Sequence, residues 1–232
     1  PAAWNNLANH YGHNGPATNA FVCYAKAIEL APRESVYYEN FATTVYLFRR
    51  DATNFFGISE EAVFDKAMAL YRKALHTDPN DADANAELGL LLVASGREHD
   101  AEPFLLTALD RDAENHRALS ALGLIALSRE SIDEAIARFV SALEIDLDNA
   151  PILARLLDCA ASAGKYDVAL PMTRRFVDFY PGNVEIALRF AEALHAAGET
   201  REAIERLDTL LLLQPGHHAA TALLARFRET SS

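Results

Sequence analysis

The sequence predicts an all-α fold, an α-solenoid built from antiparallel helix pairs, and two periodic patterns favour it. An alanine recurs at a step of 34 residues, at Ala67, Ala101, Ala135, Ala169 and Ala203. Bulky apolar residues keep the same step, at Leu88, Leu122, Leu156, Phe190 and Leu224. A period of this length is typical of helical repeat arrays, in which each repeat is one pair of helices.

Each repeat contains two amphipathic stretches with helical spacing. In the third repeat, one stretch runs from Leu88 to Leu92 and the other from Ala101 to Leu109, with Gly96 between them. Helices this short cannot bury their apolar faces alone. Stability is therefore expected to come from the stacking of each repeat on its neighbours.

We expect a single repeat array over residues 1–232, which consists of six repeats and a cap. The final stretch, His218 to Arg228, matches only the first half of a repeat and carries the charges that a terminal helix needs on its exposed side. The predicted boundaries are 1–34, 35–81, 82–115, 116–149, 150–183 and 184–217, with a capping helix at 218–229.

Glycines recur at the turn between the two helices of a repeat, at Gly15, Gly96, Gly164 and Gly198. Glycine adopts a left-handed backbone at no steric cost and commonly ends a helix in this way. We expect this conformation at all four positions.

The second repeat is longer than the others by 13 residues, which fall between Val45 and Ala67. Ser59, followed by Glu60 and Glu61, predicts a helix N-cap with acids in the first turn. We expect both helices of this repeat to lengthen and a loop to join them.

Phe55 and Phe56 lie in the inserted segment and allow two interpretations. They pack with Phe48 and Phe64 to support a longer hairpin, or they form an aromatic projection that contacts a ligand or a second copy of the chain. The sequence leaves both open.

The motif assembled in the first repeat, residues 1–34, resembles the tetratricopeptide repeat. The residues that carry this resemblance are Trp4, Leu7, Ala8, Tyr11, Ala20, Tyr24, Ala27 and Pro32. The resemblance extends over essentially the whole chain and implies a right-handed superhelix that serves as a protein-protein interaction scaffold. Single repeats depart from the pattern, as at Leu157, where a small residue is expected.

Composition excludes several classes of function. Half of the residues are hydrophobic and the net charge is -12, with a pI near 5.1. An acidic chain has no excess of cations to release phosphate counterions, so nucleic acid is not expected as a partner. No apolar run is long enough to cross a membrane, and we expect a soluble, cytoplasmic protein with no membrane insertion.

The negative charge is concentrated between Asp78 and Asp112, where nine acids face two arginines. Acids favour helix N-termini, so a solvated set of helix ends is one interpretation. The other is a docking patch for a basic partner.

No motif points to catalysis, a cofactor or a metal site. His10 and His13 could share a helix face, but neither lies near a cysteine or a carboxylate at ligand spacing. Cys23 and Cys159 are four repeats apart and are expected to be buried, unpaired small hydrophobes. We therefore expect no enzyme within this chain.

The resemblance also implies a binding surface, because members of this family hold ligands against the first helix of each repeat. Carried over by repeat register, the groove residues are Asn5, Asn9, Asn40, Thr43, Tyr46, Glu87, Leu90, Leu124, Arg155, Asp158, Arg189 and Glu192. The asparagines could hold the backbone of an extended peptide, and Leu90 and Leu124 either take an apolar side chain or pack against the next helix.

Chaperone-binding members use a clamp of lysine, arginine and asparagine for a C-terminal carboxylate. Asn9 and Asn40 match this clamp, but Asn5, Asp83 and Glu87 stand where it has cations. We expect no binding of acidic C-terminal tails.

The function that the sequence favours is a scaffold that binds a protein or peptide segment in this groove. Two alternatives remain: self-association into a homo-oligomer, and a regulatory or substrate-presenting arm of a larger enzyme or assembly.

Overall fold

The computed structural model describes residues 1–230, which contain 14 helices and no strand. The chain divides into two compact bodies, each of which contains several repeats. We call residues from Pro1 to Ala121 the first unit and residues from Leu122 onward the second unit. The division falls inside a helix, α8 (His116–Ser128). No helix in the described part of the chain has both the length and the apolar character needed to cross a bilayer.

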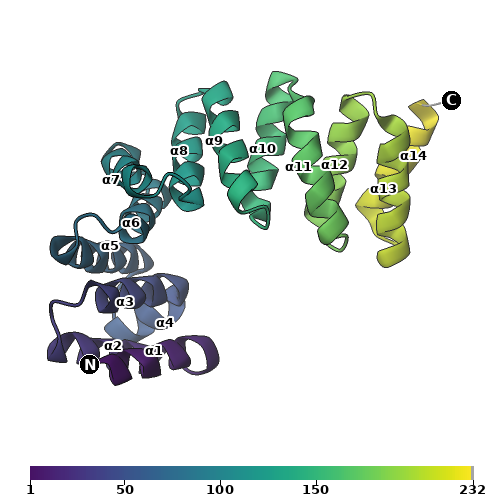
Figure 1. Cartoon of the computed structure of the whole chain (residues 1–232). Helices are drawn as coiled ribbons and strands as arrows, with labels where there is room; N and C mark the ends of the chain where they lie inside the picture. Colours follow the sequence, from purple (N-terminus) through teal and green to yellow (C-terminus); the bar gives the residue numbers. More distant parts are fainter. Residues whose placement is uncertain (231–232) are drawn as a thin grey trace. The chain divides into compact units, whose positions relative to one another are not determined.

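The first unit consists of helix pairs joined by short turns (Figure 1). α1 packs on α2, α3 on α5, and α6 on α7. The bounds of these helices are α1 Ala2–Asn14, α2 Ala17–Leu30, α3 Ser35–Leu47, α4 Arg49–Phe56, α5 Glu60–Thr77, α6 Ala82–Ala94 and α7 Glu98–Arg111.

The second unit continues the same arrangement from the later half of α8. α9 packs on α10, α10 on α11, and α12 on both α13 and α14. The bounds are α9 Ile132–Ile145, α10 Ala150–Ala163, α11 Tyr166–Phe179, α12 Val184–Ala196, α13 Thr200–Leu213 and α14 His218–Thr230.

The alanine column lies in the packed interior of the array. Ala20, Ala67, Ala101, Ala135, Ala169 and Ala203 are all completely buried. Gly89 and Gly123 lie where paired helices approach closely, since a Cβ at Gly123 would lie 2.5 Å from the Phe139 ring and one at Gly89 would lie 2.3 Å from Leu105. Small residues are thus required for the close contact on which the bulky residues pack.

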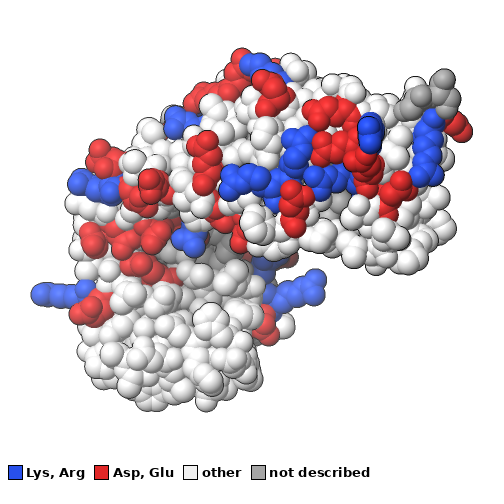
Figure 2. Space-filling view, turned by 45° about the vertical axis from the view of Figure 1, so that its right-hand side comes forward, with Lys and Arg blue, Asp and Glu red and all other residues white. Residues whose placement is uncertain are grey.

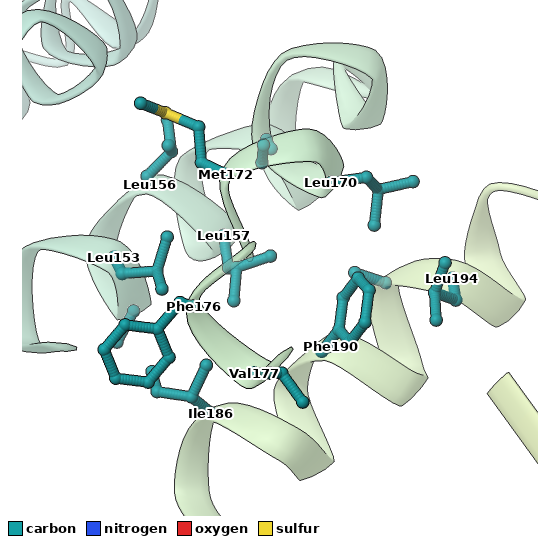
Figure 3. Close-up of a cluster of buried hydrophobic side chains, with 14 of the residues drawn as sticks. Leu153, Leu156, Leu157, Leu170, Met172, Phe176, Val177, Ile186, Phe190 and Leu194 are labelled. Carbon is teal, nitrogen blue, oxygen red and sulfur yellow. The ribbon is translucent and has the colours of Figure 1, made fainter. Parts of the chain in front are cut away.

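A continuous core runs through the second unit. Figure 3 shows Leu153 and Leu157 of α10, Phe176 of α11 and Ile186 of α12 directed into one apolar cluster. Each helix contributes one side of its surface, as stacked repeats require. The other side of the first helix in each pair remains available for polar residues.

The inserted segment corrects one expectation. It was expected to lengthen both helices and form a loop, but α3 keeps 13 residues and only α5, with 18, is extended. The residues between them form the separate helix α4, which contacts α2, α3 and α5. The N-cap at Ser59 is confirmed, since its side chain accepts a hydrogen bond from the backbone N–H of Ala62.

The turn glycines also differ in one case. Gly96, Gly164 and Gly198 are left-handed, with φ of 73°, 67° and 89°. Gly15 has φ of -145°, which is extended backbone, so the expectation was wrong there. In the fourth repeat, Glu130 adopts the left-handed conformation at φ 59° without a glycine.

Gly123→Ala tests the close contact between α8 and α9. The added methyl group meets the buried Phe139 ring, so the free energy of unfolding is expected to fall by about 1–2 kcal/mol even though alanine is the better helix former. Gly182→Ala is the matched control, because a Cβ there meets no atom within 4 Å. Urea denaturation measures both, and equal stability of the two variants would contradict this account.

Candidate functional site

Three of the predicted groove residues meet in one pocket of the first unit. Asn9 of α1 and Asn40 and Thr43 of α3 line a cavity of about 300 Å³. The rest of its lining comes from neighbouring residues of the same helices and from one tyrosine of α2: Gly12, His13, Tyr24, Thr44, Leu47 and Phe48. The first helices of two consecutive repeats therefore build a single polar pocket.

Internal hydrogen bonds orient the amides of this pocket. The hydroxyl of Tyr24 donates to Asn9 Oδ1 at 2.6 Å, and Asn40 Nδ2 donates to Asn5 Oδ1 at 3.1 Å. Asn5 is buried, whereas Asn9 and Asn40 are partly exposed. Asn9 is thus left with amide N–H donors, and Asn40 with a carbonyl acceptor, for further partners.

Hydroxyl groups connect the pocket to the second helix of each of these two repeats, α2 and α5. Thr44 Oγ1 lies 3.2 Å from the Tyr24 hydroxyl and 2.7 Å from the backbone oxygen of Asn40. Thr43 Oγ1 lies 2.7 Å from the hydroxyl of Tyr71, which α5 supplies. Nothing in the repeat pattern of the sequence reveals that the hydroxyls of Tyr24 and Tyr71 support the polar face.

Carboxylates follow on the same side of the first unit. Burial, together with the neighbouring charges of Asp81 and Asp83, raises the pKa of Glu39 to about 7, although a hydrogen bond with Ser35 opposes the rise. The Oε1 atom of Glu39 is buried and has no hydrogen-bond partner. Glu39 therefore lacks the cation that would favour its charged form.

Glu87 differs from Glu39 because a cation lies beside it. Burial raises the pKa of Glu87, and the Arg117 guanidinium, 3.3 Å from its Oε1, counteracts that rise. Arg117 also lies 3.4 Å from Asp83. Burial, followed by the charge of Glu87, raises the pKa of the Tyr71 hydroxyl well above its ordinary value.

The predicted residues of the second unit form a pocket of mixed charge. Arg155 and Asp158 of α10 and Arg189 of α12 line a cavity of about 390 Å³, together with Ala150, Pro151, Ala154, Glu185 and Ile186. Arg189 pairs with Asp158 and with Glu185, whose Oε1 lies 3.3 Å away. Glu192 lies outside this cavity, 3.7 Å from Arg226 of α14.

Figure 2 shows how the charges differ between the two units. On the face in view, the lower part of the first unit, where α1 to α4 lie, is mostly uncharged, whereas basic and acidic side chains lie side by side over the second unit. Most cations of the second unit are therefore already paired within the chain, as Arg174 is with Glu199 and Glu202.

The remaining predicted residues lie among apolar groups. Tyr46 packs edge-on against Phe64, with ring centroids 5.5 Å apart. Leu90 is partly buried, and Leu124 packs against the core of the second unit. The structure thus brings none of these three side chains into the two polar pockets.

Phe55 and Phe56 pack on the body of the first unit. Their ring centroids lie 5.4 and 5.5 Å from that of Phe21, and Phe56 also approaches Phe41 at 6.4 Å. Phe55 keeps 43% of its surface exposed. The aromatic partners are therefore Phe21 of α2 and Phe41 of α3, rather than the Phe48 and Phe64 considered from the sequence, and Lys66 of α5 lies 4.1 Å from the centre of the Phe56 ring.

The structure also places the residues considered for other chemistry. Cys23 and Cys159 are both buried free thiols. Within residues 1–230, no three side chains of the metal-binding types come together. The geometry of the described residues thus offers polar pockets for recognition.

Solved structures with the same fold are known. The chain resembles PilF of Pseudomonas aeruginosa with a TM-score of 0.73 at 21% identity, covering 97% of this chain and 96% of that one. PilW, a type IV pilus biogenesis factor, gives 0.70 at 18% identity, with 96% and 97% covered. YrrB, a repeat protein with an unusual peptide-binding site, gives 0.59 at 23% identity, with 86% and 96% covered. These likenesses establish the fold alone.

Family comparisons agree with the repeat pattern. Tetratricopeptide repeat models match residues 61–125 and 160–227, together more than half of the chain, and residues 120–184. No curated protein matches the sequence. Proteins of this family are typically scaffolds without catalytic activity, and they bind protein or peptide partners. Its helix pairs, its buried alanine column and these matches show that the chain belongs to the tetratricopeptide repeat family of protein-protein interaction scaffolds.

Proposed function

We propose that the chain binds an extended segment of a partner protein along the first helices of its repeats. The observation that carries this proposal is the pocket of the first unit, where Asn9, Asn40 and Thr43 meet. An extended peptide offers a donor and an acceptor at every residue, so one free amide N–H and one free amide oxygen suffice to bind its backbone.

The internal hydrogen bonds prepare this pair for binding. Because Tyr24 holds Asn9 and Asn5 holds Asn40, neither amide has to be ordered when the ligand arrives. Side chains that are already immobile lose little entropy on binding, and this increases affinity. The pocket therefore supplies backbone recognition that does not depend on the partner's sequence.

The acidic groups beyond the pocket favour a basic residue in the bound segment. Glu39 has a buried oxygen without a partner and lies near Asp81 and Asp83. A lysine or arginine side chain placed there would provide the missing charge. An acidic tail would be repelled by the same groups, so no such ligand is proposed.

The two amides provide the first test. Asn9→Ala with Asn40→Ala is expected to weaken binding of the partner segment at least tenfold, because each lost hydrogen bond contributes about 1 kcal/mol. Capture from native lysate with both chains, followed by titration with synthetic segments of the captured protein, measures the effect.

Two further variants make this test specific. Asn9→Asp keeps an oxygen for the Tyr24 hydroxyl but removes the N–H donors, so it should also weaken binding. Asn54→Ala removes an exposed amide of α4 and should leave binding unchanged. Equal retention of the partner by all variants, at equal helicity, would exclude the pocket as the binding site.

Titration of Glu39 tests the basic character of the partner. In the free protein its pKa is raised, so the neutral form stabilises the fold at low pH and this stability is lost as the pH rises from about 5 to 8. The expected loss is about 1 kcal/mol, reduced for solvent screening because the side chain is partly exposed. Glu39→Gln should remove this part of the pH dependence in urea denaturation.

Binding should then reverse the shift. A lysine-bearing partner segment favours the ionised carboxylate, so the pKa of Glu39 should fall when the segment binds. Carbon-13 NMR of the side-chain carboxyl measures it, with the same segment carrying methionine in place of lysine as the control. A pKa that stays near 7 in the saturated complex would show that the basic residue binds elsewhere.

A further inference from the structure

Exposed apolar residues lie in a row along one edge of the second unit. Ile145, Phe179 and Leu213 occupy the same position in three successive repeats, at the ends of α9, α11 and α13. Their exposed fractions are 44%, 72% and 53%. Figure 1 shows these three helix ends along the lower edge of the unit. We call these three residues the apolar row.

The fold does not require apolar residues at this position. The equivalent residues of two earlier repeats are polar, Thr77 and Arg111, and end their helices equally well. The apolar row contributes little to the core, since each member keeps close to half or more of its surface in water. Large apolar residues exposed at the same position of successive repeats are not scattered singly, and such groups are typical of interaction sites.

A cavity of about 470 Å³ lies at the end of α11. It is lined by Asp148, Ala150, Phe176, Tyr180, Gly182 and Asn183, with no basic residue among them. The rings of Phe176 and Tyr180 pack with centroids 4.9 Å apart, and Tyr180 is 42% exposed. An aromatic surface thus meets a carboxylate at the rim of an open cavity.

The carboxylate and the phenol are already coupled. A hydrogen bond from the Tyr180 hydroxyl to Asp148 raises the pKa of the phenol, and the charge of Asp146 adds to the effect. Asp148 is thereby held at the hydroxyl end of the ring. A carboxylate and an aromatic ring that line the same cavity both attract an ammonium or guanidinium group.

The charge of this edge decides which occupant fits. Two copies of the chain meeting here would bring Asp146 and Asp148 against the same acids, and like charges oppose such contact. An anionic membrane surface is disfavoured for the same reason. A partner segment with both apolar and basic side chains matches the apolar row and the cavity together.

We propose that this edge is a second binding surface, separate from the first-helix pockets, for a partner segment that places a lysine or arginine in the cavity beside Asp148 and Tyr180 and apolar side chains along the apolar row. The site recognises side chains, whereas the amide pocket of the first unit recognises backbone. Its occupant is therefore defined by sequence: a basic residue flanked by large apolar residues.

The test uses the full chain and a short synthetic probe, an acetylated and amidated peptide with one lysine between two leucines on each side. Titration followed by NMR is expected to shift the signals of Phe179 and Tyr180. The dissociation constant should rise at least fivefold in Asp148→Asn and in Phe179→Ser. The same peptide with glutamate in place of lysine should shift neither signal.

Two matched controls occupy equivalent repeat positions. Glu114→Gln makes the same change of charge at the position equivalent to Asp148, where the residues that correspond to Phe176 and Tyr180 are Ala142 and Asp146. Leu30→Ser removes an apolar side chain, 50% exposed, from the position equivalent to Phe179. Both should keep the wild-type dissociation constant within twofold.

Three results would overturn the proposal. They are the absence of shifts at saturating peptide, shifts confined to Asn9 and Asn40, and equal weakening by the control variants. Circular dichroism confirms beforehand that all variants are equally helical, which is expected because the substituted side chains are exposed.

Discussion

Close approach of the two helices within each repeat is the constraint on which the rest of this structure depends. Fully buried alanines, and glycines at 89 and 123, let backbones come near enough for bulky side chains such as Leu105 and Phe139 to fill the remaining space. A larger residue at these positions would force the pair apart and remove contacts with the next repeat as well. Since every repeat is stabilised by its neighbours, the loss would spread beyond one pair.

This packing uses one side of each first helix and leaves the other side free to vary. In the first unit that free side carries amides, hydroxyls and a carboxylate, joined across repeats by bonds such as that from Asn40 to Asn5. In the second unit it carries ion pairs, such as that of Arg189 with Asp158. A ligand of the first unit meets oriented neutral groups, whereas a ligand of the second must compete with charges that already satisfy one another.

The electrostatics of the first unit follow from burial rather than from composition alone. The chain has many acids, but Glu39 differs from most of them because its oxygen is buried without a partner. Glu87 is partly buried, and Arg117 lies beside it. The same residue type thus has two chemical roles within one face, and only Glu39 has an unmet need for a cation. This contrast is what makes a basic partner the better match for the acidic region.

The sequence by itself determined the helix pairs, the alanine column, the N-cap at Ser59 and the family, because a 34-residue period records which residues must be small or apolar for repeats to stack. The resemblance to the family, carried over by repeat register, also placed Asn9, Asn40 and Thr43 on one face. Only the tertiary structure decided that the insertion forms α4 with Phe55 and Phe56 packed on Phe21, and that Tyr24 orients Asn9. It alone joined Asp148, in the turn between α9 and α10, to Tyr180, which follows α11. Those contacts depend on the distance between helices and on side-chain conformation, which a repeat period does not encode.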